Sequence, residues 1–177
     1  MSRAGSIELI LGGAPSGKSA LAESLAQQDG RPVTYVATAE ALDGEMADRI
    51  ARHRERRPAD WALVEAPMAL AETVTTHAAA GRLLLVDCLT LWLSNLLAAG
   101  EGALEREREA LLTTLPQLPG RILLVSNEVG LGIVPDNAPA RRFRDEAGRL
   151  NQAVAARADR VIFTVAGLHQ VLKGEPL

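Results

Sequence analysis

Short apolar segments recur along the chain, and longer stretches with a helical spacing of apolar and polar residues separate them. The segments are nearly continuously apolar, which is typical of strands that are buried on both faces of a sheet. We predict strands at Ile7–Leu11, Val33–Ala37, Leu83–Asp87, Ile122–Asn127 and Val161–Val165, with a further edge strand at Trp61–Glu65. We predict helices at Lys18–Gln28, Asp43–Arg56, Ala69–Ala79, Leu89–Leu97, Leu104–Leu115 and Ala138–Ala156.

The alternation of strands and helices predicts an α/β fold, with a mostly parallel, doubly wound sheet and helices on both of its faces. A chain of 177 residues has the usual length of one domain. Its sequence contains no internal repeat and no linker-like change of composition. We therefore predict a single domain over residues 1–177.

The overall composition narrows the class of partner. A net charge of -3 and only 3% aromatic residues differ from the basic, aromatic surfaces of nucleic-acid-binding proteins, so we expect a small-molecule substrate and no nucleic acid. The single cysteine, Cys88, cannot form an internal disulfide, which fits a reducing compartment. No apolar stretch approaches the ~20 residues that a membrane-spanning helix needs. We therefore expect no membrane span and a cytoplasmic location.

Between the first predicted strand and the first predicted helix, the chain reads GGAPSGKS, which matches the P-loop pattern G-x-x-x-x-G-K-[ST]. In a P-loop, backbone N–H groups and the helix N-terminus surround a polyphosphate. Lys18 would reach the β- and γ-phosphates, and the Ser19 hydroxyl would ligate Mg²⁺. The correct flanks disfavour a chance glycine-rich turn. We predict nucleotide contacts at Gly12, Gly13, Ala14, Pro15, Ser16, Gly17, Lys18 and Ser19.

A second feature of P-loop enzymes is an acidic residue at the end of a buried strand. Asp87 follows the apolar run Leu83–Val86 and is our candidate for the carboxylate that holds Mg²⁺. The alternative is that Asp87 caps the helix that begins at Leu89. We interpret Cys88 as a small buried hydrophobic residue, because it has no basic neighbour in the sequence to activate the thiol.

The segment Asp43–Pro58 begins with acidic residues and ends with arginines, which complements the dipole of a helix. Arg49, His53 and Arg57 recur every four residues and would share a face that could meet a triphosphate. The many arginines disfavour a charged imidazole, and a neutral histidine nitrogen can attack phosphorus to form a covalent intermediate. On composition alone, however, an exposed arginine-rich helix with an incidental histidine is the stronger interpretation.

The segment Ser126–Pro135 directly follows a predicted strand, at the edge where open α/β sheets bind ligands. Gly130 and Gly132 suit a loop with unusual backbone angles or close ligand approach. We interpret the segment as an active-site loop, with an ordinary flexible connection as the alternative.

These motifs together resemble one enzyme family closely over nearly the whole chain. The family is the bifunctional adenosylcobinamide kinase/adenosylcobinamide-phosphate guanylyltransferase of cobalamin biosynthesis. The resemblance rests on GGAPSGKS at Gly12, YVATAE at Tyr35, the DGEMADRIARHRERRP run at Asp43, LLLVDCLTLWLSNLL at Leu83 and SNEVGLGIVPDNAPARRFRDEAGRLNQ at Ser126. The P-loop by itself is generic, whereas the other strings in this order are highly specific.

The resemblance implies two reactions at one nucleotide site: phosphorylation of adenosylcobinamide by ATP or GTP, and transfer of GMP from GTP to the resulting phosphate through a guanylylated histidine. That histidine corresponds to His53, which reverses the preference above. Lys18 of the P-loop is our second candidate catalytic residue. The further nucleotide contacts that the resemblance implies are Ala37, Thr38, Ala39, Arg54, Glu55, Arg56, Arg57, Glu65 and Asp87. A RecA-like fold and a homotrimer are also implied. Pro15 stands where the family often has arginine.

Two other functions remain open from the residues. One is a simple P-loop kinase that transfers only a γ-phosphate and does not use His53. The other is a nucleotide-gated switch or an ATPase subunit, although the chain lacks the N-K-x-D string that reads guanine in such switches and is short for a motor.

Overall fold

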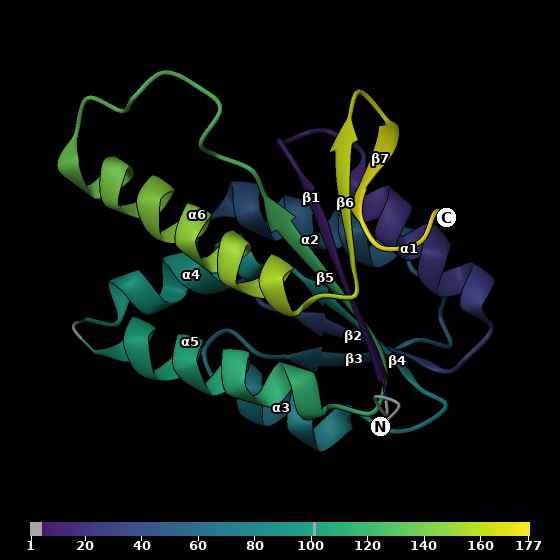
Figure 1. Cartoon of the computed structure of the whole chain (residues 1–177). Helices are drawn as coiled ribbons and strands as arrows, with labels where there is room; N and C mark the ends of the chain where they lie inside the picture. Colours follow the sequence, from purple (N-terminus) through teal and green to yellow (C-terminus); the bar gives the residue numbers. More distant parts are fainter. Residues whose placement is uncertain (1–4, 101) are drawn as a thin grey trace.

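The computed structural model describes residues 5–100 and 102–177. Within this part of the chain, seven strands form one sheet in the order β3-β2-β4-β5-β1-β6-β7 (Figure 1). The strands are β1 (Gly5–Gly12), β2 (Val33–Ala37), β3 (Ala62–Glu65), β4 (Leu83–Asp87), β5 (Gly120–Asn127), β6 (Arg160–Val165) and β7 (Leu168–Lys173). Neighbours pair in parallel except β6 and β7, which are antiparallel.

The register of the parallel strands brings several chemically important residues to one edge of the sheet. Gly12 at the end of β1 pairs with Asn127 at the end of β5. Ala37 at the end of β2 pairs with Asp87 at the end of β4. Since the carboxyl ends of parallel strands share an edge, the P-loop and Asp87 lie at the same edge, on either side of the end of β5.

Helices cover both faces of the sheet. The helices are α1 (Lys18–Asp29), α2 (Gly44–Arg56), α3 (Leu70–His77), α4 (Leu89–Ala98), α5 (Ala103–Thr114) and α6 (Ala138–Arg157), with a 3₁₀ turn, η1 (Leu115–Gln117). Helices α3 to α6 pack on one face, where they share a large apolar cluster with the strands. Helix α1 packs on the opposite face through Ala22 and Ala26.

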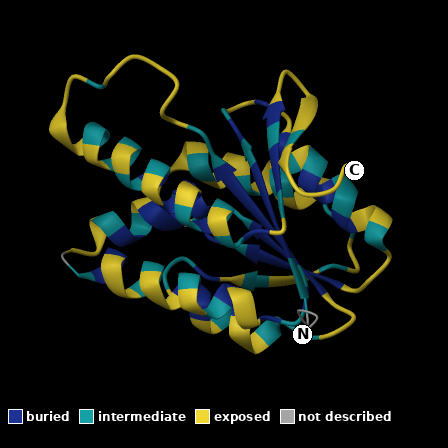
Figure 2. Cartoon of the chain, viewed as in Figure 1, coloured by how far each residue is buried: buried dark blue, intermediate teal, exposed yellow. Residues whose placement is uncertain are grey.

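Successive side chains of a strand point to opposite faces of the sheet, so each central strand contributes to the apolar clusters on both faces. In β4, Leu84 and Val86 join the cluster under α3 to α6, while Leu83 and Leu85 join the cluster under α1. The fully buried Trp92 of α4 lies in the larger cluster, and its indole N–H donates to the Met68 carbonyl at 2.7 Å. Figure 2 shows the strands as the buried centre and the outer sides of the helices as the exposed surface.

Helix α2 differs from the other helices because it lies at the carboxyl edge of the sheet. The Asp43 side chain caps it by accepting from the Met46 backbone N–H at 2.7 Å, a common N-terminal signal. Within the described chain, no residue of α2 is fully buried. The helix is therefore attached by a small number of side chains.

The predicted α/β fold with a mostly parallel sheet is confirmed, and all the predicted strands and helices occur with ends that differ by a few residues. The predicted edge strand is β3. Strand β7 was not predicted, because its residues are largely exposed and carry no buried apolar run. It forms a hairpin with β6 across Ala166 and Gly167, which both have positive φ angles. Among the described residues, no helix is long and apolar enough to cross a membrane.

Candidate active site

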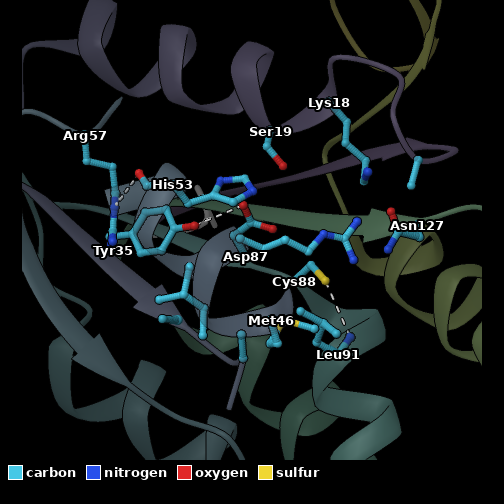
Figure 3. Close-up of a pocket in the computed structure, with 15 residues that line it drawn as sticks. Lys18, Ser19, Tyr35, Met46, His53, Arg57, Asp87, Cys88, Leu91 and Asn127 are labelled. Carbon is cyan, nitrogen blue, oxygen red and sulfur yellow. Dashed lines mark hydrogen bonds between the residues drawn. The ribbon is translucent and has the colours of Figure 1, made fainter. Parts of the chain in front are cut away.

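A cavity lies at the carboxyl edge of the sheet, where the P-loop, the ends of β2, β4 and β5, and helices α2 and α4 meet (Figure 3). Two sides of this cavity differ in origin. One side comes from the P-loop and Asp87, and the other comes from α2 through Arg49, His53 and Arg57. The cavity therefore brings together the P-loop and the histidine-bearing face that the sequence indicated separately.

Glycines give the P-loop its shape. Gly17 has a φ angle of 93° and is the N-cap of α1, a conformation that favours glycine. A Cβ atom on Gly12 would lie 2.6 Å from the Thr164 carbonyl oxygen, so β6 leaves no space for a side chain there. The Gly167 N–H of the β6–β7 turn donates to the Ser16 carbonyl at 2.9 Å. The hairpin that sequence reasoning missed therefore supports the phosphate-binding loop.

Lys18 and Ser19 begin α1 and line the cavity. The Lys18 ammonium donates to the Gly13 carbonyl at 3.3 Å, which holds it against the loop. Burial lowers the pKa of Lys18, and the nearby Asp87 carboxylate opposes this shift. The positive charge and the hydroxyl thus face the same space as the carboxylate of Asp87.

Asp87 is held by a tyrosine on the neighbouring strand. The Tyr35 hydroxyl donates to Asp87 Oδ2 at 3.0 Å. Burial and the adjacent Asp87 charge raise the pKa of Tyr35, so the hydroxyl remains a donor. The alternative role of Asp87 as a helix cap is wrong, because Cys88 is the N-cap of α4 and its Sγ accepts from the Leu91 N–H. Cys88 is buried, and burial raises the pKa of its thiol, as expected of an inert cysteine.

Arg57 attaches the end of α2 to the sheet. Its guanidinium carbon lies 4.1 Å from the centre of the Tyr35 ring, within the range of a cation–π contact. Its Nε donates to the His53 carbonyl at 3.1 Å. A chain of contacts therefore runs from Asp87 through Tyr35 and Arg57 to the backbone of His53.

His53 lines the cavity, and one of its ring nitrogens is buried. Nδ1 is buried, has no hydrogen-bond partner among the described residues, and is 3.9 Å from Oε1 of Glu23 on α1. The side chain is 35% exposed. Since Nδ1 is buried, we expect a ligand in the cavity to approach Nε2.

The other residues that the resemblance implies as nucleotide contacts fall into two groups, inside and outside the cavity lining. Ala14, Ala37 and Ala39 line the cavity. Thr38 is buried, and its hydroxyl bridges the N–H and C=O groups of Cys88 at 2.9 and 2.7 Å. The remaining ones are outside the cavity lining, and their nucleotide contacts stay predictions: Gly12, Gly13, Pro15, Ser16, Gly17, Arg54, Glu55, Arg56 and Glu65.

Several cavity residues were not predicted as site residues. Met46 and Ile50 precede His53 on α2 by seven and three residues, so helical spacing could have placed them on its face. Tyr35 and Asn127 lie at or near strand ends, where only the sheet order shows that they converge. In the segment Ser126–Pro135, Asn127 lines the cavity, but most of the following residues are exposed, and the role of that loop stays a prediction.

The fold and the site define a P-loop nucleotide-binding protein of the RecA-like α/β class. The defining features are a P-loop after β1, an acidic residue at the end of β4 and the order of the parallel strands. Solved structures agree on the fold. A protein from Pyrococcus horikoshii OT3 matches with a TM-score of 0.59 at 8% identity, covering 99% of this chain and 89% of that one. The RadB recombinase matches with a TM-score of 0.53 at 16% identity, covering 89% and 73%.

Sequence comparison identifies the family. The model of the cobinamide kinase / cobinamide phosphate guanyltransferase family matches residues 8–172. The bifunctional adenosylcobalamin biosynthesis protein CobP of Pseudomonas aeruginosa is 63% identical, over 96% of this chain and 99% of that protein. Its CobU counterpart from Salmonella typhimurium is 41% identical, over 93% and 98%. The chain belongs to this family, which confirms the predicted kinase and guanylyltransferase class of cobalamin biosynthesis.

Proposed function

We propose that this cavity serves both reactions of the family. In the first, ATP or GTP phosphorylates the hydroxyl of adenosylcobinamide. In the second, GMP passes from GTP to adenosylcobinamide phosphate and yields adenosylcobinamide-GDP and diphosphate. The observation that carries the proposal is that Lys18 of the P-loop and His53 of α2 line one cavity.

The P-loop side suits phosphoryl transfer. Backbone N–H groups at the start of α1 would bind the β- and γ-phosphates, and Lys18 would offset charge as the γ-phosphoryl group moves. The Ser19 hydroxyl and the Asp87 carboxylate line the same space and are oxygen ligands of the kind that Mg²⁺ prefers. Bound Mg²⁺ would neutralise phosphate charge in the transition state.

The α2 side suits nucleotidyl transfer. With the β- and γ-phosphates in the P-loop, His53 Nε2 would attack the α-phosphorus of GTP and displace diphosphate. Arg49 also lines the cavity, and its guanidinium would stabilise charge on the phosphoryl oxygens. The phosphate of the second substrate would then take the GMP group from the histidine.

We also propose a homotrimer in the cytoplasm. Large apolar side chains are exposed on β7 and on the loop before α6, among them Leu168, Leu131 and Ile133, and such side chains favour burial between subunits. Sedimentation at several protein concentrations tests the assembly, and a monomer throughout contradicts it.

Labelling with α-labelled GTP tests the nucleotidyl-transfer half. The protein should acquire label through a bond that is stable in base and labile in acid, and His53→Ala should reduce labelling to background. His169→Ala, which changes an exposed histidine of β7, is the matched control and should keep full labelling. Label that persists in His53→Ala removes His53 from the reaction. Phosphorylation of adenosylcobinamide without any labelling of the wild-type protein favours a simple kinase.

A further inference from the structure

A buried carboxylate next to His53 has no role in the reactions described above. Glu23 lies on α1, four residues after Ser19, and its side chain is only 10% exposed. Its Oε1 atom is buried and has no hydrogen-bond partner among the described residues. A buried carboxylate oxygen without a donor is costly, so its retention calls for a specific reason.

His53 supplies the matching polar atom. Its Nδ1 is also buried and without a hydrogen bond among the described residues, and it lies 3.9 Å from Glu23 Oε1. Among the described residues, His53 is the basic residue whose side-chain nitrogen lies within 4.0 Å of the Glu23 carboxylate. Arg57 has other contacts, because it stacks on Tyr35 and donates to the His53 carbonyl.

We infer that Glu23 is a positioning residue for His53, which rests on the proposed role of His53 as the guanylylated residue. A donor–acceptor distance of 3.9 Å exceeds that of a hydrogen bond, but contacts of this kind often tighten when substrate binds. A small rotation of the ring brings Nδ1–H onto Oε1. This hydrogen bond selects the tautomer that carries hydrogen on Nδ1 and leaves the lone pair on Nε2, toward the cavity.

The pairing also fits the charge that develops in the reaction. Nε2 donates its lone pair to the α-phosphorus, an N–P bond forms, and the bond from that phosphorus to the bridging oxygen breaks. Diphosphate leaves with the electron pair, and the imidazole becomes cationic while it keeps the proton on Nδ1. The Glu23 carboxylate stabilises this cation. When a substrate phosphate oxygen attacks the same phosphorus, the N–P electrons return to Nε2, so no net proton transfer is required.

Rapid-mixing measurements of labelling by α-labelled GTP test this inference. In Glu23→Gln, the labelling rate constant at saturating GTP should fall by at least about 10-fold, as removal of a residue that orients a histidine commonly costs, while the GTP concentration for half-maximal rate changes little. Glu23→Asp keeps the charge and should recover part of the rate. Glu72→Gln, which removes an exposed carboxylate from α3, is the matched control.

The ratio of labelling rate to γ-phosphoryl transfer rate separates positioning from a structural defect. Positioning predicts a lower ratio in Glu23→Gln, whereas an equal loss of both reactions, or no loss, overturns the inference. The ¹⁵N chemical shifts of His53 in the wild-type protein with a non-transferable GTP analogue bound give a test that does not depend on any variant folding: the tautomer with hydrogen on Nδ1 is expected, and hydrogen on Nε2 overturns the inference. Label that persists in His53→Ala would instead reject the proposed function.

Discussion

The two sides of the cavity are built in contrasting ways. The P-loop side is backbone held between buried strands, with Gly12 packed against β6 and Ser16 bonded to the β6–β7 turn. The α2 side is a helix with no fully buried residue in the described chain, attached through a few side chains such as Arg57. The shape of the P-loop is therefore set by the fold, whereas the position of the histidine is set by individual contacts. Substitutions on the two sides should separate the two reactions.

The largest effect is expected on the P-loop side, because both proposed reactions would use a triphosphate bound there. Lys18→Ala should lower both the kinase and the guanylyltransferase rates by about 100- to 1000-fold, the usual cost of removing a group that stabilises transition-state charge. Lys173→Ala, on β7, is the matched control, since its ammonium contacts the carbonyls of Ala155 and Ala156 outside the cavity. Steady-state assays of both reactions measure the effect. Loss of only one reaction would show that the two reactions do not share the triphosphate site.

A smaller and more selective effect is expected on the α2 side. Arg57→Ala removes the contact with the Tyr35 ring and the hydrogen bond to the His53 carbonyl. Since a cation–π contact contributes about 0.5–2 kcal/mol, we expect guanylylation to fall by roughly 3- to 30-fold and the kinase reaction by less. Arg52→Ala, an exposed position of the same helix, is the control. An equal decrease in both reactions, with weaker nucleotide binding, would instead make Arg57 a direct nucleotide contact.

The same contrast explains what the sequence could predict. The P-loop and Asp87 follow buried strands directly, so local pattern placed them at the correct edge of the sheet. The face shared by Arg49, His53 and Arg57 followed from helical spacing, but its position over the P-loop depends on long-range packing. Glu23 and His53 are on different helices, and no local pattern relates them.

The family resemblance predicted some of the site residues that local sequence patterns could not, but not all of them. It singled out His53, which lines the cavity, together with Glu65, which is exposed at the end of the edge strand β3. It also implied contacts at Arg54, Glu55 and Arg56, which are exposed and outside the cavity lining. The distance of these exposed side chains from the cavity follows from long-range packing, which local sequence patterns do not contain.

The smallest effect concerns Tyr35, where the two sides meet. Burial raises its pKa, and the Asp87 charge adds to the shift. Tyr35 is the only tyrosine of the chain, so absorbance near 295 nm reports its ionisation without interference from other tyrosines. The native protein should show no tyrosinate absorbance as the pH rises through the ordinary value of 10.0, and unfolding should release it.

The raised pKa of Tyr35 also predicts the direction in which the free energy of unfolding changes with pH. The folded state keeps the Tyr35 proton to a higher pH than the unfolded state does, so the associated stability is fully present below about pH 10 and declines as the pH rises above it. Tyr35→Phe removes the ionisation and should unfold with a weaker pH dependence above pH 10, measured by denaturant titration. If tyrosinate absorbance appears near pH 10 in the folded protein, the hydroxyl is not held against Asp87. Arg57 would then stack on a ring that Asp87 does not hold, and the attachment of α2 to the P-loop side would have to come from other residues.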